Sequence, residues 1–270
     1  MGDWKGLKSF LLQIKNLSKH YTRIGLEKEL VLESIDLSIE VAEEGRIISV
    51  LAPFGSGKTT LLKIISSLEK PSDGEVLLLG KKYENPAGEI AYLPEKPSHF
   101  PWLNVEENIK LISQMREEKL HQETIKKVIS LAGLTGYENY IPHYKSYGFR
   151  FRAALGRALV ANPRIILLDD VFKNIDIVTK GELYTTLKEI KNELKLTFIL
   201  ATANVTESII LSDHIFLMQG KPGKIIAEID SEKLEKVSGN TKTEEFTFIR
   251  KEIEFAYQIE NSSSSINISI

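Results

Sequence analysis

Short apolar runs alternate with longer amphipathic segments along the chain. Residues Ile47–Leu51, Ile165–Leu168 and Thr197–Ala201 are apolar at nearly every position. Strands that are apolar on both faces are typical of a sheet that helices cover on both sides. The pattern therefore predicts an α/β fold with a mainly parallel core sheet.

Two other regions have the pattern of antiparallel strands. Alternating positions with polar breaks extend over Leu11–Ser38, and we interpret them as strands that lead into the core. Later, Ile215–Met218 and Lys224–Ile229 flank the turn-forming sequence Gly220-Lys221-Pro222-Gly223. This second region predicts a β-hairpin.

The pattern becomes helical between Pro94 and about Val160. Helical periodicity occupies Asn104–Glu117, Glu123–Ala132 and Phe151–Val160, and no convincing strand lies among these segments. We interpret this region as a helical lobe inserted into the α/β core.

After Ile229 the sequence is charged and weakly helical, and it ends in a Ser- and Asn-rich segment. We expect disorder in that last segment. The apolar residues before it are expected to cover the core, with a regulatory site as the alternative; they are Leu234, Phe246, Phe248, Ile249, Ile253 and Phe255. The predicted organisation is a core of residues 10–94 and 160–229, a lobe of 95–159, an extension of 230–258 and a disordered tail of 259–270.

The composition limits the kinds of molecule with which the protein is expected to associate. The 270 residues carry a formal net charge of −2, and the basic excess of a nucleic-acid-binding protein is missing. There are no cysteines, which excludes disulfides and Cys-based metal sites and fits a reducing compartment. No apolar stretch approaches the roughly 18 residues that span a bilayer, and the start does not resemble a signal peptide. We therefore expect membrane association only through a partner.

A glycine-rich loop joins the first apolar run to an amphipathic helix. Gly55 and Gly57 allow the backbone to approach phosphates, Lys58 supplies a positive charge and the Thr59 hydroxyl suits Mg²⁺. Ala52 stands where such loops usually begin with glycine. The residues expected to bind Mg-ATP or Mg-GTP at this loop are Gly55, Ser56, Gly57, Lys58, Thr59 and Thr60. The alternative is a plain strand-to-helix turn with a solvated lysine.

A second apolar strand ends in two carboxylates. Arg164–Asp170 carries Asp169 and Asp170 at its end. In proteins with a phosphate loop such an aspartate lies near the magnesium ion, and Asp169 fits this role. The alternative is a polar strand end whose acids face solvent.

Two further segments resemble one protein family. Lys145–Leu159 is similar to the signature segment and helix of ABC ATPases, which usually read L-S-G-G, two residues, then Q-R. Pro101–Asn108 resembles the P-W-L-T-V-x-x-N segment of nitrate-, sulfonate- and taurine-type importers. The chain therefore resembles the ATP-binding subunits of ABC transporters over about residues 12–230.

This resemblance implies a P-loop NTPase (RecA-like) core with an antiparallel β-subdomain and an inserted helical lobe. It also implies a head-to-tail dimer with a second ABC ATPase subunit, in which Ser146 and Gly148 contact the ATP held by the opposite chain. Permease transmembrane subunits would dock on the lobe, at the cytoplasmic face of the membrane. Tyr21 would stack on adenine and Asp176 would be the D-loop aspartate. A packed strand aromatic and a helix N-cap are the respective alternatives.

Three departures from the family pattern concern hydrolysis. Asp170 stands where the family has its catalytic glutamate, and Val171 replaces the following proline. Ala203 occupies the position of the switch histidine, with Asn204 as a possible substitute. Glu95 replaces the Q-loop glutamine and adds negative charge, which should weaken ATP binding unless the metal offsets it. Asp170 and Glu95 are nevertheless the candidate catalytic positions.

Two further departures lie in the signature segment. Tyr147 places a bulky side chain where the family has glycine, and Phe151 replaces glutamine. Together the five changes suggest that nucleotide binding is kept while hydrolysis is impaired. The hypothesis is a degenerate subunit that pairs with a competent ATPase. The alternatives are an active homodimeric importer ATPase and a soluble nucleotide-gated regulatory protein.

Overall fold

The computed structural model describes residues 9–22, 28–84, 86, 88–115, 121–230, 234 and 241–265. The chain divides into two compact units. The first comprises residues 1–43, 48–86 and 201–270, and the second comprises 44–47 and 87–200. Among the described residues, no helix combines the length and the apolar character needed to cross a membrane.

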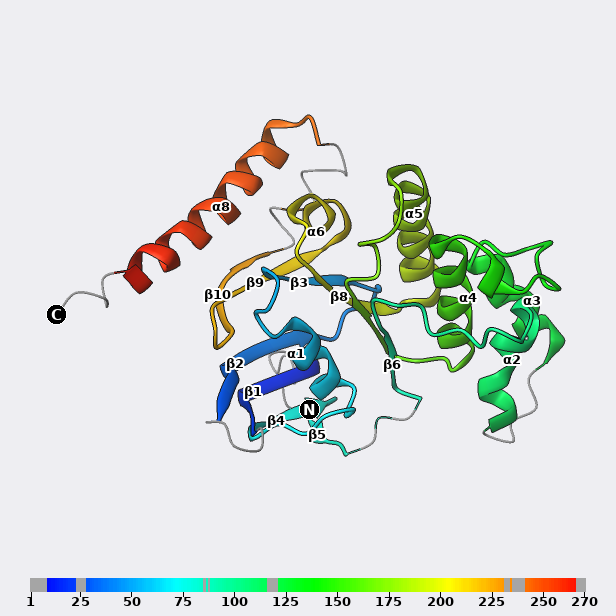
Figure 1. The fold of residues 1–270 in the computed structure, drawn as a ribbon, viewed down its shortest axis with the longest axis horizontal. Helices are drawn as coiled ribbons and strands as arrows, with labels where there is room; N and C mark the ends of the chain where they lie inside the picture. The colour runs from blue at the N-terminus through cyan, green and yellow to red at the C-terminus, as the bar shows by residue number, and fades with distance from the viewer. Residues whose placement is uncertain are drawn as a thin grey trace, which may run out of the picture. The chain divides into compact units, whose positions relative to one another are not determined.

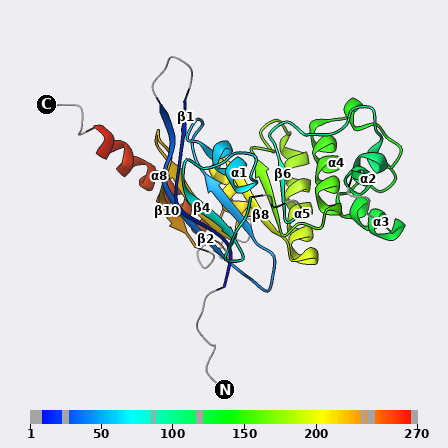
Figure 2. The ribbon, with the colours of Figure 1, turned by 90° about the horizontal axis from the view of Figure 1, so that it is seen from below.

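An antiparallel sheet forms one part of the first unit (Figure 2). Its strands, in the order β2-β1-β4-β5, are β2 Glu29–Glu40, β1 Phe10–Tyr21, β4 Asp73–Leu78 and β5 Lys81–Lys82. Along β2, Ile35, Leu37 and Ile39 are buried, whereas the residues between them are exposed. This alternation gives the sheet one apolar and one polar face. The prediction of antiparallel strands over Leu11–Ser38 is confirmed.

A second group of strands in this unit carries the glycine-rich loop. All residues of β3 Ile47–Leu51 are buried; its first residue belongs to the second unit, and the rest of β3 pairs in parallel with β9 His214–Gln219. Strand β9 in turn pairs with β10 Lys224–Ile229 in the predicted hairpin. Helix α1 Lys58–Ile65 follows the loop and buries its apolar face.

The C-terminal extension packs onto these strands. Helix α8 Glu244–Ser265 and helix α6 Val205–Leu211 share a buried cluster with β9 and β10. From the extension, the cluster takes Leu234, Phe246, Ile249 and Ile253, so these residues cover the core as predicted. The other two aromatic residues of this set do not: the side chains of Phe248 and Phe255 are 64% and 61% exposed.

Helix α8 continues into the predicted tail, whose disorder remains a prediction. It runs to Ser265, and so it occupies residues 259–265, for which the sequence predicted disorder. A helix that is already nucleated adds residues one hydrogen bond at a time, which offsets a local Ser- and Asn-rich composition. The remaining part of the predicted tail, residues 266–270, lies outside the described residues.

The second unit contains a parallel group of strands. They are β8 Thr197–Thr202, β7 Ile165–Asp169 and β6 Ile90–Leu93, in the order β8-β7-β6; the last two residues of β8 belong to the first unit. Ile90 lies opposite Ile165 in the parallel β6–β7 pair. The long helix α5 Ile177–Leu194 joins β7 to β8. These elements confirm the predicted α/β fold class.

In the described part of the second unit, the other helical elements are three α-helices and one turn of 3₁₀ helix (Figure 1). They are α2 Val105–Met115, α3 Gln122–Leu131, η1 Pro142–Tyr144 and α4 Tyr147–Val160. Helix α4 begins at Tyr147 rather than at the predicted Phe151, because Ser146 accepts a hydrogen bond from the Phe149 amide and caps it. Residues 116 and 117 of the first predicted helix lie outside the described residues. The predicted domain boundaries remain predictions.

Candidate nucleotide-binding site

The loop between β3 and α1 has a backbone that requires glycine. Gly57 has φ of 94°, in the left-handed region that side chains disfavour. A Cβ atom at Gly57 would also lie 2.7 Å from the Leu32 side chain. The Gly57 carbonyl accepts the first helical hydrogen bond, from Leu61 N at 2.9 Å. Both the turn and the start of α1 therefore depend on this residue.

Polar groups of the loop are directed inward. Lys58 is buried, and its ammonium donates to the carbonyls of Ala52 and Pro53 at 3.0 and 3.1 Å. The Ser56 hydroxyl donates to the Pro53 carbonyl at 2.8 Å. No acidic residue lies in the first turn of α1, so its amide dipoles favour an anion. The loop thus combines a lysine with the positive end of a helix.

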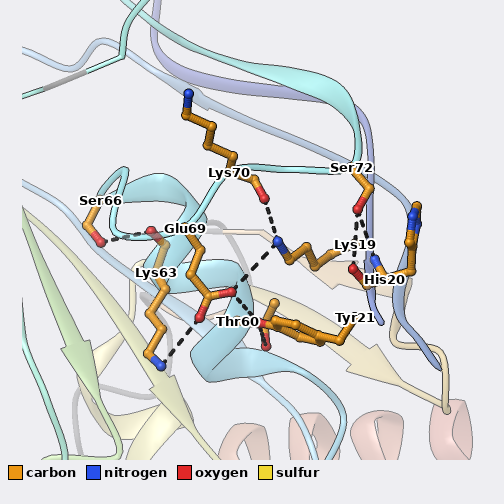
Figure 3. Close-up of polar contacts among 9 residues, drawn as sticks. All are labelled: Lys19, His20, Tyr21, Thr60, Lys63, Ser66, Glu69, Lys70 and Ser72. Atoms are coloured by element: carbon orange, nitrogen blue, oxygen red, sulfur yellow. Dashed lines mark hydrogen bonds and ion pairs between the residues drawn. The ribbon is translucent and has the colours of Figure 1, made fainter. Parts of the chain in front are cut away.

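Tyr21 contacts the same helix through its phenol (Figure 3). Its hydroxyl donates to Glu69 and lies 3.4 Å from the Thr60 hydroxyl. The Lys19 ammonium lies 4.9 Å from the centre of the Tyr21 ring, and the Lys63 ammonium is 3.4 Å from Glu69. Burial and the neighbouring Glu69 carboxylate raise the pKa of Tyr21. The tyrosine predicted to stack on adenine is therefore fixed to the phosphate-loop helix.

The end of β8 adjoins the beginning of the loop. The Ala52 amide donates to the Thr202 carbonyl at 3.0 Å. The next residue, Ala203, is exposed and offers only a methyl group. The carbonyl oxygen of the Asn204 side chain accepts from the Glu207 amide at 3.0 Å and caps α6. Asn204, the possible substitute for histidine, is thus engaged as a helix cap.

The paired carboxylates lie at the end of β7, in the second unit. Asp169 is buried and accepts a hydrogen bond from the Tyr92 hydroxyl at 2.8 Å. Asp170 has φ of 48°, a left-handed conformation that aspartate tolerates better than most residues. The chain therefore turns sharply after Asp169, and the two carboxylates lie in different environments.

Glu95 has a partner that the sequence did not reveal. Its carboxylate lies 3.0 Å from the Lys173 ammonium, and its backbone carbonyl accepts from the Tyr147 hydroxyl at 2.6 Å. The hydrogen bond with Glu95 is the main cause of the raised pKa of Lys173. The extra negative charge at this position is therefore balanced within the protein. Lys173 lies shortly after the acidic strand in sequence. Its pairing with Glu95 forms only in the folded chain, where Lys173 reaches the loop after β6.

Gly148 of the signature segment lies at a tightly packed position. A Cβ atom at Gly148 would lie 2.5 Å from the Thr179 methyl group. Phe151 is fully buried with its ring centre 5.8 Å from that of Phe172, so the residue that replaces glutamine packs into the core. Ser146 caps α4 and is exposed.

Asp176 lies at the start of α5. Its carboxylate accepts from the Thr179 amide at 2.9 Å, and this hydrogen bond lowers the pKa of Asp176. It is the N-cap of α5, the plain structural role anticipated for it. A role across a dimer remains a prediction.

Two oxygen donors suit magnesium. Thr59 is exposed in the first turn of α1, and Asp169 is the last residue of β7. No group of three or more His, Cys, Asp or Glu side chains among the described residues is arranged to hold a metal ion. Magnesium commonly binds through one or two protein oxygens together with substrate phosphates and water. Thr59 and Asp169, each in its own unit, are therefore donors of the kind that suits an ion arriving with a nucleotide, and such an ion would neutralise phosphate charge.

The predicted site residues therefore fall into two groups. The loop residues and Tyr21 belong to the first unit, where the phenol of Tyr21 meets Thr60. Asp169, Asp170, Glu95, Ser146, Gly148 and Asp176 belong to the second unit. Sequence reasoning missed Glu69, Tyr92 and Lys173, which position these groups. Each is an ordinary polar residue with no motif of its own.

Comparison with known proteins identifies the family of the chain. The model of the ABC transporter family matches residues 32–173. An aliphatic sulfonates import ATP-binding protein from Bacillus cereus is 33% identical over 242 residues, covering 90% of this chain and 94% of that protein. A spermidine/putrescine import ATP-binding protein from Spiroplasma citri is 34% identical, covering 82% of this chain and 65% of that protein.

Solved structures agree in fold. A dimeric ATP-binding cassette bound to ADP and phosphate superposes with a TM-score of 0.70 at 26% identity, over 82% of this chain and 98% of that chain. A component of a clostridial ABC transporter complex has a TM-score of 0.73 at 21% identity, over 94% of this chain and all of that chain. The predicted P-loop NTPase fold is confirmed. The chain belongs to the ABC transporter ATP-binding family.

Proposed function

We propose that the chain is the ATP-binding subunit of an ABC importer, which binds Mg-ATP at a dimer interface and drives or regulates a permease. The phosphate loop carries this proposal. A buried lysine, glycines with positive φ and a helix start without acidic residues all suit a polyphosphate. Tyr21 supplies an aromatic surface attached to the same helix. Thr59 and Asp169 would hold the magnesium ion.

We further propose that intrinsic hydrolysis is weak. Asp170 has a carboxylate one methylene shorter than glutamate, about 1.5 Å less reach toward an attacking water. At the end of β8, Ala203 has no polar group to contact a terminal phosphate. Loss of a general base or of an electrostatic contact commonly costs about 10²–10⁴ in rate. The chain would bind ATP and turn it over slowly.

Partners follow from the same proposal. Exposed aromatic side chains gather on the second unit: Trp102 is 71% and Tyr144 is 80% exposed. Neighbouring rings support this surface, with Phe100 against Trp102 and His143 against Tyr144. Exposed aromatic groups of this kind are typical of interaction sites. We assign this surface to the permease subunits, through which the chain would reach the cytoplasmic face of the membrane, and we place a second ABC ATPase at the nucleotide.

The test measures Mg-ATP binding and phosphate release on the purified chain. Lys58→Ala serves as the blank, because it removes the buried cation of the loop. We expect saturable binding that Lys58→Ala abolishes, with phosphate release no faster than the blank. Release of order 0.1–10 s⁻¹, near the ordinary range for enzymes, would reject weak hydrolysis and favour an active homodimer. Failure of the natural chain to bind ATP would reject the proposed function itself.

A further inference from the structure

A second lysine lies on the phosphate loop. Lys221 belongs to the turn between β9 and β10, far from the loop in sequence. A Cβ atom in place of a Gly55 hydrogen would lie 3.0 Å from Lys221 Cε and 3.1 Å from Lys221 Nζ. The charged end of this side chain, and not only its stem, therefore contacts the loop backbone.

The turn that carries Lys221 is hydrogen-bonded to β2 and packs against the loop. The Gly223 amide donates to the Val31 carbonyl at 2.9 Å, and the Gly223 carbonyl accepts from the Glu33 amide at 3.1 Å. A Cβ atom at Gly223 would lie only 2.0 Å from the Ser56 carbonyl oxygen. Backbone thus packs on backbone, with no side chain between them. Lys221, two residues away, is held beside the loop by this contact.

The charge of Lys221 is available to a ligand. Its side chain is exposed, and no described carboxylate forms an ion pair with it. Lys224, on the same hairpin, instead pairs with Glu33 at 3.1 Å. Lys58 is buried and bonded to two loop carbonyls. The loop therefore has one buried cation within it and a second, exposed cation at its rim.

We infer that Lys221 is a second phosphate-binding cation of the nucleotide site, an inference that rests on the proposed function. Phosphate oxygens bind to loop amides at about 2.9 Å, which places them close to an ammonium group that already touches Gly55. A lysine is a flexible point charge with three donors, suited to following a phosphate chain. Ala203, where β8 ends beside the loop, offers no polar group, whereas Lys221 brings a positive charge to Gly55 of the loop.

The experiment compares two lysines of one hairpin. Mg-ATP affinity is measured for the natural chain, Lys221→Met, Lys221→Arg and Lys224→Met at low and high salt. Removal of a partly exposed cation should weaken binding about three- to thirtyfold at low salt, and less at high salt. Lys221→Arg should restore most of the affinity. Lys224→Met removes the same charge at a position that does not touch Gly55, and it should change affinity less than twofold.

The outcomes separate this inference from the proposed function. If the natural chain fails to bind Mg-ATP, the proposed function fails. If the natural chain binds and both methionine variants weaken binding equally, the effect is one of net charge and the role of Lys221 is overturned. Unchanged binding by Lys221→Met overturns it as well. Thermal unfolding without nucleotide should be the same for all four proteins, which shows that the turn remains folded.

Discussion

The contact between the β9–β10 turn and the phosphate loop allows a sharp test by substitution of Gly223 with alanine. The new Cβ atom would lie 2.0 Å from the Ser56 carbonyl oxygen and 2.3 Å from the Met218 methyl group. A methionine end can rotate away, but a carbonyl cannot move without the loop that carries it. We therefore expect the turn and the loop to separate. Ser56 belongs to the phosphate loop, so both the affinity for ATP and the free energy of unfolding should decrease.

The magnitude follows from the cost of overpacking. One extra methyl group forced into a packed site costs about 1–3 kcal/mol, and a backbone obstacle places this case near the upper end. For a chain of this size, that corresponds to a fall in melting temperature of roughly 2–4 °C per kcal/mol. Thermal unfolding measures the stability of the variant, and titration with Mg-ATP measures the affinity of its phosphate loop for the nucleotide. Both should change together.

Gly181→Ala is the matched control. Gly181 lies within α5, and a Cβ atom there meets nothing within 4 Å. Alanine in a helix is favoured over glycine by about 0.5–1 kcal/mol, so this variant should be as stable as the natural protein or more so, with unchanged ATP binding. If Gly223→Ala melts at the natural temperature and binds ATP normally, the reasoning about the rigid backbone contact is refuted.

Three other predictions test the site. Asp170→Glu combined with Ala203→His should raise phosphate release at least tenfold over the natural chain, measured in steady state; an unchanged rate would show that other departures limit hydrolysis. Tyr21→Leu should weaken ATP binding by about 1–3 kcal/mol in a titration, whereas Tyr21→Phe keeps the ring and should stay within about threefold; equal losses would argue against stacking. Lys173→Met leaves Glu95 unpaired and should raise the dissociation constant of Mg-ATP about two- to fivefold, and adding Glu95→Gln should restore it. If the double variant binds Mg-ATP no more tightly than Lys173→Met alone, this charge balance is contradicted.

Local patterns predicted most of the fold. The buried strand at Ile47–Leu51 and the hairpin around Gly220 show in sequence because burial on two faces and turn chemistry leave local signatures. The start of α4 was placed too late, since its apolar periodicity becomes clear only after the capping residue Ser146. The end of α8 has a Ser- and Asn-rich composition that favours disorder, so local pattern alone does not predict a helix there.

The candidate site was predictable to a lesser extent. The loop containing Lys58 is a contiguous motif, so its chemistry could be inferred from neighbouring residues alone. The partners of Glu95 and Gly55 could not, because Lys173 and Lys221 reach them only through tertiary packing. A lysine in a sequence is usually a solvated surface charge. Only the folded chain distinguishes these two from the others.

The link between α8 and the strand before the phosphate loop sets a limit on how far the chain can be shortened. The Tyr257 hydroxyl donates to the Leu51 carbonyl at 2.8 Å, and Leu51 is the last residue of β3. Leu51 also belongs to the apolar cluster that α8 covers. Truncation at residue 230 would expose that cluster and leave this carbonyl without the phenol. We therefore expect a chain truncated at residue 230 to be less stable, because the extension covers the strand that leads to the phosphate loop.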